Sequence, residues 1–130
     1  MLRHLKLWEM PKESFLKNRL KSVVYAVRGA ILLIRTEASI KVQVVLGLLV
    51  TALGFYFEIS NMEWIIQILA VAMVLGTEGL NTAIEKLADF CQPEFDERIG
   101  FIKDVSAGAV MLVSTAAAIV GLIIYIPKIF

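Results

Sequence analysis

The sequence contains few of the residues on which disulfide scaffolds and zinc sites depend. Cys91 is the only cysteine and His4 the only histidine among the 130 residues. A single cysteine cannot form an intramolecular disulfide and matches no metal-binding spacing, so both of those classes are excluded. We expect Cys91 to lie in a loop, and His4 to lie in an N-terminal segment without catalytic partners. The N-terminus also lacks an apolar run followed by a cleavage site, so we predict no signal peptide.

Common phosphate-binding and nucleic-acid motifs are absent as well. The sequence has no G-x-x-x-x-G-K-[ST] loop and no protein-kinase signature, so any bound ATP must be held in another way. The basic residues follow no aromatic-interleaved or zinc-finger pattern, and we expect no nucleic-acid partner. Aromatic residues make up only 9% of a chain that is 58% hydrophobic. The apolar residues are therefore mainly aliphatic, which is typical of membrane helices.

Three apolar runs, residues 40–57, 64–85 and 105–126, are candidates to cross a bilayer. A crossing takes about 20 residues at about 1.5 Å per residue. A soluble three-helix bundle is the alternative, but a surface helix should show a polar stripe. The third run carries no charge and shows little more than Ser106 and Ser114. We therefore predict an all-α membrane protein, with a single domain over residues 1–130 and three transmembrane helices.

The N-terminal third is basic, and its pattern predicts an amphipathic helix over about residues 11–36. Apolar side chains such as Phe15, Val23 and Ile31 recur at helical spacing, with lysine and arginine between them. A helix of this kind lies along the membrane interface. With the N-terminus in the cytoplasm, 12 of the 13 lysine and arginine residues lie inside and only Lys128 lies outside. We predict that orientation from the positive-inside rule. Three short helices make a thin bundle, so we also expect an oligomer.

Polar residues interrupt the second run in a regular way. Glu78, Asn81, Glu85 and Asp89 follow one another at spacings of three, four and four residues. At 100° per residue they lie within roughly 80° of one another, on one stripe of a helix. If Trp64 marks the outer boundary, Glu78 lies about 21 Å inward and Glu85 about 32 Å, against a core of about 30 Å. The stripe therefore places one carboxylate inside the lipid boundary and another at the surface.

That geometry suits two different roles. A carboxylate within the boundary can take a proton from a hydroxyl that cannot leave the membrane, whereas one at the surface can hold a metal ion. Glu37 is expected at the level of Glu85, and two carboxylates with open water positions suit Mg²⁺. Lys103 could add a point charge for a phosphate. The acidic residues of the predicted inner loop, residues 90–103, fit a solvated loop as well as a site.

Other functions remain open on these residues alone. The stripe could hold helices together in a non-catalytic membrane scaffold. A small oligomeric transporter that couples Glu78 to protons is a further alternative, because intramembrane acids often mark proton pathways. The outer half of the second run argues against transport, since Gln67 is its only polar group.

Three stretches carry a more specific combination: TEAS before the first run, EGLNTAIEKLADF, and IKDVSAGAV at the start of the third run. They contain the pattern E-x-x-N-[ST]-A-[IV]-E followed by K-D. From about Phe15 to the C-terminus the sequence resembles the prokaryotic diacylglycerol kinase family, which includes undecaprenol kinases. The resemblance implies a bacterial inner-membrane enzyme that uses ATP and Mg²⁺ to phosphorylate a lipid alcohol. It also implies a homotrimer whose active sites are shared between neighbouring subunits.

The resemblance assigns roles residue by residue. It makes Glu78 the general base, supported by Asn81, and makes Glu37 and Glu85 the metal ligands. The residues that it places near the nucleotide are Tyr25, Gly29, Glu94, Phe95, Asp96, Lys103 and Asp104.

Three positions depart from the family pattern. Asn18 stands where members usually carry an arginine, Gly79 replaces a larger apolar residue, and Gln43 occupies a position that often holds an acid or a histidine. We assign no role to Gln43. The third run resembles the undecaprenol kinase branch, whereas TEAS lacks a proline often found there. We therefore expect activity on both undecaprenol and diacylglycerol, with undecaprenol modestly preferred.

Overall fold

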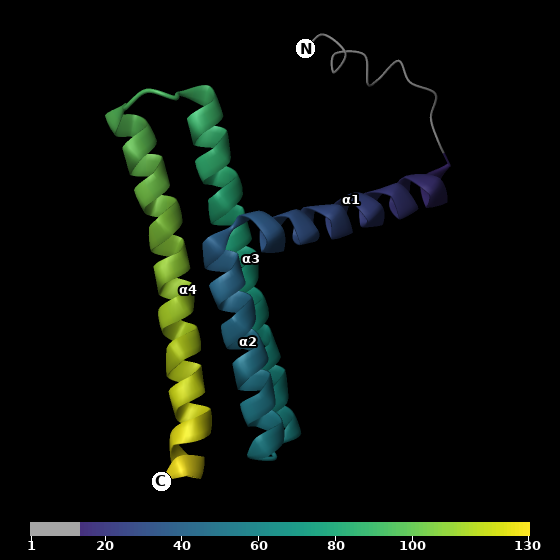
Figure 1. The fold of residues 1–130 in the computed structure, drawn as a ribbon, viewed down its shortest axis with the longest axis vertical. Helices are drawn as coiled ribbons and strands as arrows, with labels where there is room; N and C mark the ends of the chain where they lie inside the picture. Colours follow the sequence, from purple (N-terminus) through teal and green to yellow (C-terminus); the bar gives the residue numbers. More distant parts are fainter. Residues whose placement is uncertain (1–13) are drawn as a thin grey trace. The chain divides into compact units, whose positions relative to one another are not determined.

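The computed structural model describes residues 14–130, which form four helices (Figure 1). Their bounds are α1 (Phe15–Thr36), α2 (Ala38–Tyr56), α3 (Asn61–Cys91) and α4 (Glu97–Ile129). The predicted all-α class is confirmed for this part of the chain. By length and composition α2, α3 and α4 could each cross a membrane. The three predicted spans fall on these helices, except that Phe57 lies just beyond the end of α2.

Residues 14–32 and residues 33–130 belong to two separate compact units. In the first unit α1 begins at Phe15, and the earlier part of the predicted helix, from Pro11, lies outside the described residues. The Arg19 guanidinium lies 5.2 Å from the centre of the Phe15 ring, and that of Arg28 lies 5.8 Å from the Tyr25 ring. The amphipathic character of α1 and its position along the membrane interface stay predictions.

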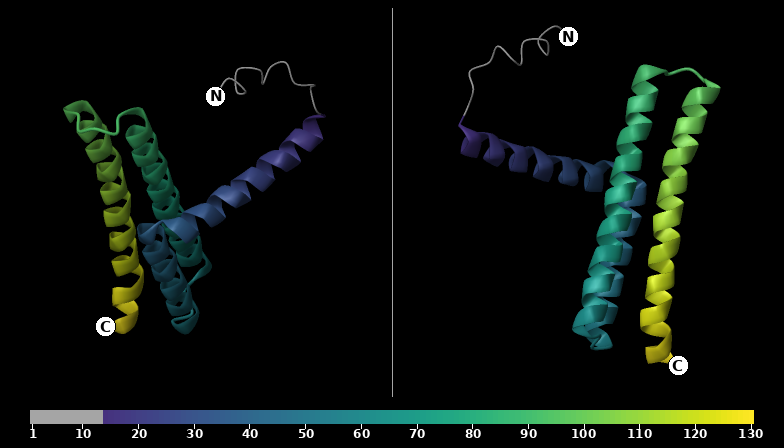
Figure 2. Two further views of the ribbon diagram at one scale, coloured as in Figure 1. Left: turned by 45° about the horizontal axis from the view of Figure 1, so that its top comes forward. Right: turned by 180° about the vertical axis from the view of Figure 1, so that it is seen from behind.

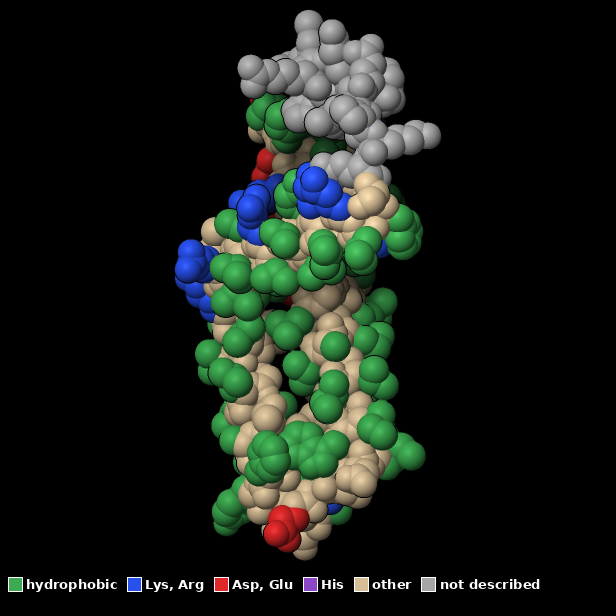
Figure 3. Space-filling view, turned by 90° about the vertical axis from the view of Figure 1, so that its right-hand side faces the viewer, with side chains coloured by type: hydrophobic (Ala, Val, Ile, Leu, Met, Phe, Trp, Pro, Cys, Tyr) green, Lys and Arg blue, Asp and Glu red, His purple; other side chains and the backbone are tan. Residues whose placement is uncertain are grey.

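The second unit is organised around α3, which contacts both α2 and α4 (Figures 1 and 2). In both figures α3 runs antiparallel to its two neighbours. Large aliphatic side chains remain exposed on all three helices, and hydrophobic side chains follow the helices in the lower part of Figure 3. This surface is typical of helices that face lipid rather than water.

Specific contacts fix how far each helix is shifted along its neighbour. The α3–α4 register follows from three polar pairs: Asp89 with Lys103, Gln67 with Tyr125, and Glu63 with Lys128. The α2–α3 register follows from Gly47 against Val71, Val50 against Gln67, and Gly54 against Trp64. Because antiparallel helices advance in opposite directions by equal steps, these registers place Ile40 and Ser114 at the level of Glu78. Glu37 falls at the level of Asn81.

Glycine allows α2 to approach α3 closely. A Cβ atom at Gly54 would lie 2.6 Å from the Trp64 ring, and one at Gly47 would lie 3.2 Å from a Val71 methyl group. Small residues at such positions are the usual means by which membrane helices pack, since lipid offers no hydrophobic driving force.

The loop between α3 and α4 is shorter than the sequence suggested. The prediction of an inner loop over residues 90–103 is wrong, because α3 continues to Cys91 and α4 begins at Glu97. Cys91 is accordingly the exposed last residue of α3, not a loop residue. The Asp96 carboxylate accepts a hydrogen bond from the Arg98 backbone N–H and so caps α4. We call this end of the unit, around residues 92–96, the hairpin end.

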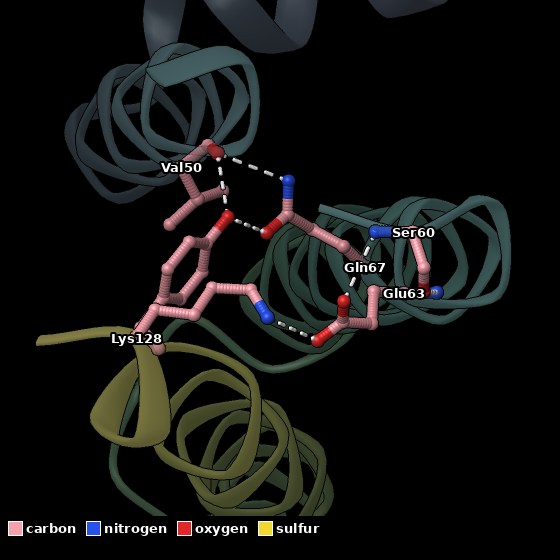
Figure 4. Close-up of polar contacts among 6 residues, drawn as sticks. Val50, Ser60, Glu63, Gln67 and Lys128 are labelled. Atoms are coloured by element: carbon pink, nitrogen blue, oxygen red, sulfur yellow. Dashed lines mark hydrogen bonds and ion pairs between the residues drawn. The ribbon is translucent and has the colours of Figure 1, made fainter. Parts of the chain in front are cut away.

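The opposite end, around residues 57–60, is called the Ser60 end. There Ser60 and Glu63 form a capping box that starts α3, with Ser60 Oγ accepting from the Glu63 N–H at 3.1 Å. Lys128 of α4 donates to Glu63 at 3.0 Å, so the acid that caps α3 also binds the end of α4 (Figure 4).

A hydrogen-bonded group joins all three helices near the Ser60 end. Gln67 Nε2 donates to the Val50 carbonyl at 3.0 Å (Figure 4). The Tyr125 hydroxyl lies 2.5 Å from Gln67 Oε1 and 3.0 Å from the same carbonyl, and donates to one of them at a time. Gln67 and Tyr125 are both buried. We call Val50, Gln67 and Tyr125 the polar lock.

We expect Tyr125→Phe to lower the free energy of unfolding in detergent micelles by about 0.5–2 kcal/mol, the range of hydrogen bonds between membrane helices. The change removes the hydroxyl and leaves the buried Gln67 oxygen without this donor. Tyr56→Phe is the matched control, because Tyr56 is 79% exposed. Equal effects of the two substitutions would contradict a stabilising role for the lock.

Candidate active site

The predicted polar stripe is present on α3, and its middle part is buried. Glu78, Asn81 and Thr82 are 8%, 9% and 7% exposed, whereas Glu85 is half-buried. Burial of polar groups within an apolar helix costs free energy unless a partner compensates it. This concentration of buried polar groups therefore marks the stripe as the best candidate for a functional site in the described chain.

Gly79 explains part of that burial. The Leu33 side chain packs against α3 here, and a Cβ atom at Gly79 would lie 3.0 Å from Leu33 Cδ1. A larger residue would push Leu33 away from the helix beside Glu78.

Asn81 is only partly satisfied. Its Nδ2 donates to Glu85 Oε1 at 3.3 Å, while its Oδ1 is buried without a hydrogen-bond partner. A buried acceptor that lacks a donor costs about 1–3 kcal/mol. A hydroxyl group or a cation placed beside Asn81 would remove that cost.

Glu37 lies at the junction of α1 and α2. The α2–α3 register places it at the level of Asn81, about one turn from the level of Glu85 at which the sequence predicted it. Its backbone is extended, and its side chain makes no capping hydrogen bond to α2. Lys86 Nζ lies 3.8 Å from its carboxylate oxygen, and the Glu37 side chain is 23% exposed. The carboxylate is therefore partly exposed and makes one loose ion pair, which a metal ion could replace.

These donors fit Mg²⁺ held jointly by protein and substrate. No group of three or more histidine, cysteine or acidic side chains that could hold a metal occurs among residues 14–130. Mg²⁺ is commonly bound by one or two carboxylates together with substrate phosphates, and it prefers oxygen donors. Glu37, Glu85 and the unpartnered Asn81 oxygen supply such donors without forming a closed cage of protein ligands.

The predicted nucleotide-contacting residues fall into separate groups. Lys103 donates a hydrogen bond to Asp89, which joins α4 to the stripe near the hairpin end. Asp104, the next residue on α4, is exposed, as are Glu94 and Phe95 in the loop. Tyr25 and Gly29 belong to the first unit, whereas the stripe belongs to the second.

Asp96 has a structural role that the sequence prediction did not include. Its carboxylate accepts hydrogen bonds from the Arg98 guanidinium, at 3.2 and 3.0 Å, and from the Arg98 N–H at 2.8 Å. These interactions hold the pKa of Asp96 below its usual range. The negative charge stabilises the start of α4, in addition to any contact with a nucleotide.

Sequence reasoning missed Lys86, Thr82 and the partners of Gln67. Thr82 could have been found, because it lies four residues after Glu78 on the same face. Lys86 follows Glu85 directly, but its approach to Glu37 depends on the α2–α3 register. Tyr125 carried no local signal of its pairing with Gln67.

A family model described as prokaryotic diacylglycerol kinase matches residues 24–125. An undecaprenol kinase of Bacillus subtilis is 35% identical over 108 residues, covering 83% of this chain and 88% of the relative. A diacylglycerol kinase of Haemophilus influenzae is 27% identical over 114 residues, covering 88% of this chain and 94% of the relative. A diacylglycerol kinase of Helicobacter pylori is 28% identical over 102 residues, covering 78% of this chain and 80% of the relative. The range matched by the family model includes every predicted site residue.

Proposed function

Because the chain belongs to the prokaryotic diacylglycerol kinase family and is therefore a lipid kinase, we propose that it transfers the γ-phosphoryl group of ATP to a membrane lipid alcohol. The lipid oxygen forms a bond to the γ-phosphorus, the bond from that phosphorus to the β–γ bridging oxygen breaks, and ADP leaves. The observation that carries the proposal is the buried Glu78 on the same stripe as Asn81, whose oxygen lacks a partner.

Glu78 is the general base in this proposal. Its carboxylate accepts the proton of the lipid hydroxyl as the oxygen attacks phosphorus. Asn81 lies one turn further along α3 and is held by Glu85, so its Oδ1 is positioned to accept a hydrogen bond from the incoming substrate. Such positioning matters because phosphoryl transfer depends mainly on alignment and charge stabilisation.

Glu37 and Glu85 are the proposed ligands of Mg²⁺. Mg²⁺, when bound, supplies positive charge that stabilises the phosphoryl oxygens. Lys103, which donates a hydrogen bond to Asp89, places a second cation near the hairpin end. Contacts of the nucleotide with Tyr25, Gly29, Glu94, Phe95, Asp96 and Asp104 are proposed from the family resemblance.

We place the hairpin end in the cytoplasm of a bacterium, with the protein in the inner membrane and the N-terminus on the same side. Helices α3 and α4 contain 31 and 33 residues, about 46 and 50 Å, so they exceed a hydrocarbon core of about 30 Å. The excess accommodates the charged residues around the loop. This orientation puts the Mg²⁺ ligands at the face where ATP is present.

The proposed assembly is a homotrimer with active sites shared between subunits. It is supported by the family resemblance and by the many large aliphatic side chains that a three-helix unit leaves exposed. Native mass spectrometry from mild detergent should give a trimer mass. Full activity in a preparation that contains only monomers would contradict the proposal.

The test of function is phosphorylation of purified lipids by the purified protein in detergent or bilayers. We expect ATP-dependent and Mg²⁺-dependent phosphorylation of both undecaprenol and diacylglycerol. Undecaprenol should be modestly preferred when the two compete at equal mole fraction, because a pocket that reads only chain shape discriminates by about 1–3 kcal/mol per misfitted group. No product from either lipid would contradict the proposed reaction. A strong preference for diacylglycerol would contradict only the ranking.

A further inference from the structure

Lys86 is a cation beside the candidate site to which the proposed reaction assigns no role. It directly follows Glu85 on α3, and its Nζ lies 3.8 Å from a carboxylate oxygen of Glu37. Glu37 and Glu85 are the two proposed metal ligands. Lys86 is therefore next to one of them in the sequence and next to the other in space.

The position of Lys86 on α3 directs its side chain toward Glu37. Gly79 and Lys86 are seven residues apart, so they lie on nearly the same face of the helix. Leu33 packs against Gly79 on that face, and the Glu37 N–H donates to the Leu33 carbonyl at 3.1 Å. Side chains of a helix lean toward its N-terminus. Lys86 thus reaches back from its own level to that of Glu37, over about 7.5 Å along α3.

The ion pair between Lys86 and Glu37 is loose. Its 3.8 Å separation exceeds the range of a hydrogen bond, and the Lys86 side chain is 73% exposed. Lys103, by contrast, donates a hydrogen bond to Asp89, and its side chain is 37% exposed. Exposed ion pairs contribute little to stability. Lys86 can therefore exchange its partner at low cost.

The proposed metal and nucleotide change the partners that Lys86 can choose. Once Glu37 binds a divalent cation, its carboxylate no longer attracts Lys86 as a free negative charge. Phosphate oxygens of the nucleotide are strong acceptors for an ammonium group. A lysine has a flexible four-carbon stem and rotatable donors, so it can turn to them without a change in the backbone. Lys86 also lies on the hairpin side of Asn81, which is the side where the proposed orientation places ATP.

We propose that Lys86 is a phosphate-binding residue of the kinase site, whose ammonium group leaves Glu37 for a nucleotide phosphate when Glu37 binds the metal. The inference rests on the proposed lipid kinase function and adds a cation that the family resemblance does not assign. A lipid phosphate offers the same oxygens as a nucleotide phosphate, so the test has to distinguish these two sources.

The measurement is the Kd of AMP-PNP, a non-hydrolysable ATP analogue, at saturating Mg²⁺ in maltoside detergent without phospholipid. We expect Lys86→Gln to raise this Kd by about 3–10-fold, a loss between that of an exposed ion pair and that of a charged hydrogen bond. Lys86→Arg keeps the charge and should retain most of the affinity. Lys128→Gln is the matched control, because Lys128 also pairs with a carboxylate, that of Glu63, but at the Ser60 end (Figure 4). It should leave the Kd unchanged.

A double substitution separates a contact with the nucleotide from an effect exerted through Glu37. In a Glu37→Gln background the ion pair cannot form, and Lys86→Gln should still raise the Kd by a similar factor. No further change in that background would show that Lys86 only orients Glu37, and would overturn the proposal. A lower Kd for Lys86→Gln alone would show that Lys86 competes with the metal for Glu37, and would overturn it as well.

Two further outcomes are distinguished by the same preparations. A difference between Lys86→Gln and the unsubstituted protein that appears only after phosphatidylglycerol is added would assign Lys86 to a lipid phosphate and overturn the proposal. An unchanged Kd in every condition, with an active unsubstituted enzyme, would also overturn it. Absence of both AMP-PNP binding and lipid phosphorylation in the unsubstituted protein would instead overturn the proposed function.

Discussion

Glu78→Gln is expected to lower kcat by about 10²–10⁴-fold, the usual contribution of a general base. The amide has nearly the same size as the carboxylate, so packing around the 8%-exposed side chain is retained. It cannot take the proton from the lipid hydroxyl. Nucleotide binding should survive, because the resemblance places the nucleotide on other residues. The measurement is steady-state lipid phosphorylation, with ATP-analogue binding determined separately.

The matched control for Glu78→Gln is Glu97→Gln, which removes the same charge at an exposed position in the first turn of α4. It should leave kcat close to that of the unsubstituted enzyme. Near-normal turnover by Glu78→Gln would contradict the assignment of Glu78 as the general base. Loss of ATP-analogue binding together with turnover would point to a nucleotide-binding role instead.

Glu85→Gln is expected to raise the Mg²⁺ concentration for half-maximal activity by at least about 10–100-fold, the cost of losing even an outer-shell partner of a metal. The glutamine oxygen can still accept the hydrogen bond from Asn81, which now lies 3.3 Å from Glu85 Oε1. The substitution therefore removes charge while it preserves the contact that orients Asn81. Saturating Mg²⁺ should restore much of the turnover, which distinguishes this variant from Glu78→Gln.

The Mg²⁺ titration is done at saturating lipid and a fixed concentration of the Mg²⁺–ATP complex. Glu97→Gln again serves as the control and should leave the titration midpoint unchanged. An unchanged midpoint for Glu85→Gln would exclude Glu85 as a metal ligand. A lower kcat at every Mg²⁺ concentration, with the same midpoint, would assign it to the alignment of substrates.

The sequence predicted the stripe because helical spacing depends only on the chain itself. The spacing of Glu78, Asn81 and Glu85 places them on one face of any regular helix, and the structure has that helix. The apolar runs predicted three long helices for the same reason. Glu78 and Asn81 are buried within the protein, while their depth in the membrane stays a prediction.

What the sequence could not predict depends on contacts between helices. The polar lock requires a register that brings Gln67 of α3 to Tyr125 of α4. Gln67 stands out as a lone polar residue in an apolar run, but nothing near it in the sequence points to Tyr125. The loop is shorter than predicted because most of the charged residues after Phe90 belong to α4. Asp96 in fact caps α4, and its contacts with Arg98 stabilise the start of that helix.

The polar contacts that hold α2 are stronger at Val50 than near Glu37. The polar lock holds α2 at Val50, whereas near Glu37 its polar link to α3 is an ion pair with Lys86, whose side chain is 73% exposed. Such exposed pairs contribute at most about 1 kcal/mol. From Val50 to Ala38 the helix is a lever of about 18 Å, so a tilt of about 5° about the lock moves its free end by about 1.6 Å. Burial of Ile40, which is 3% exposed, holds the first turn of α2 by apolar contacts instead of hydrogen bonds. Apolar contacts are not directional, so we expect the width of the candidate site near Glu37 to vary more than the helix spacing at the polar lock.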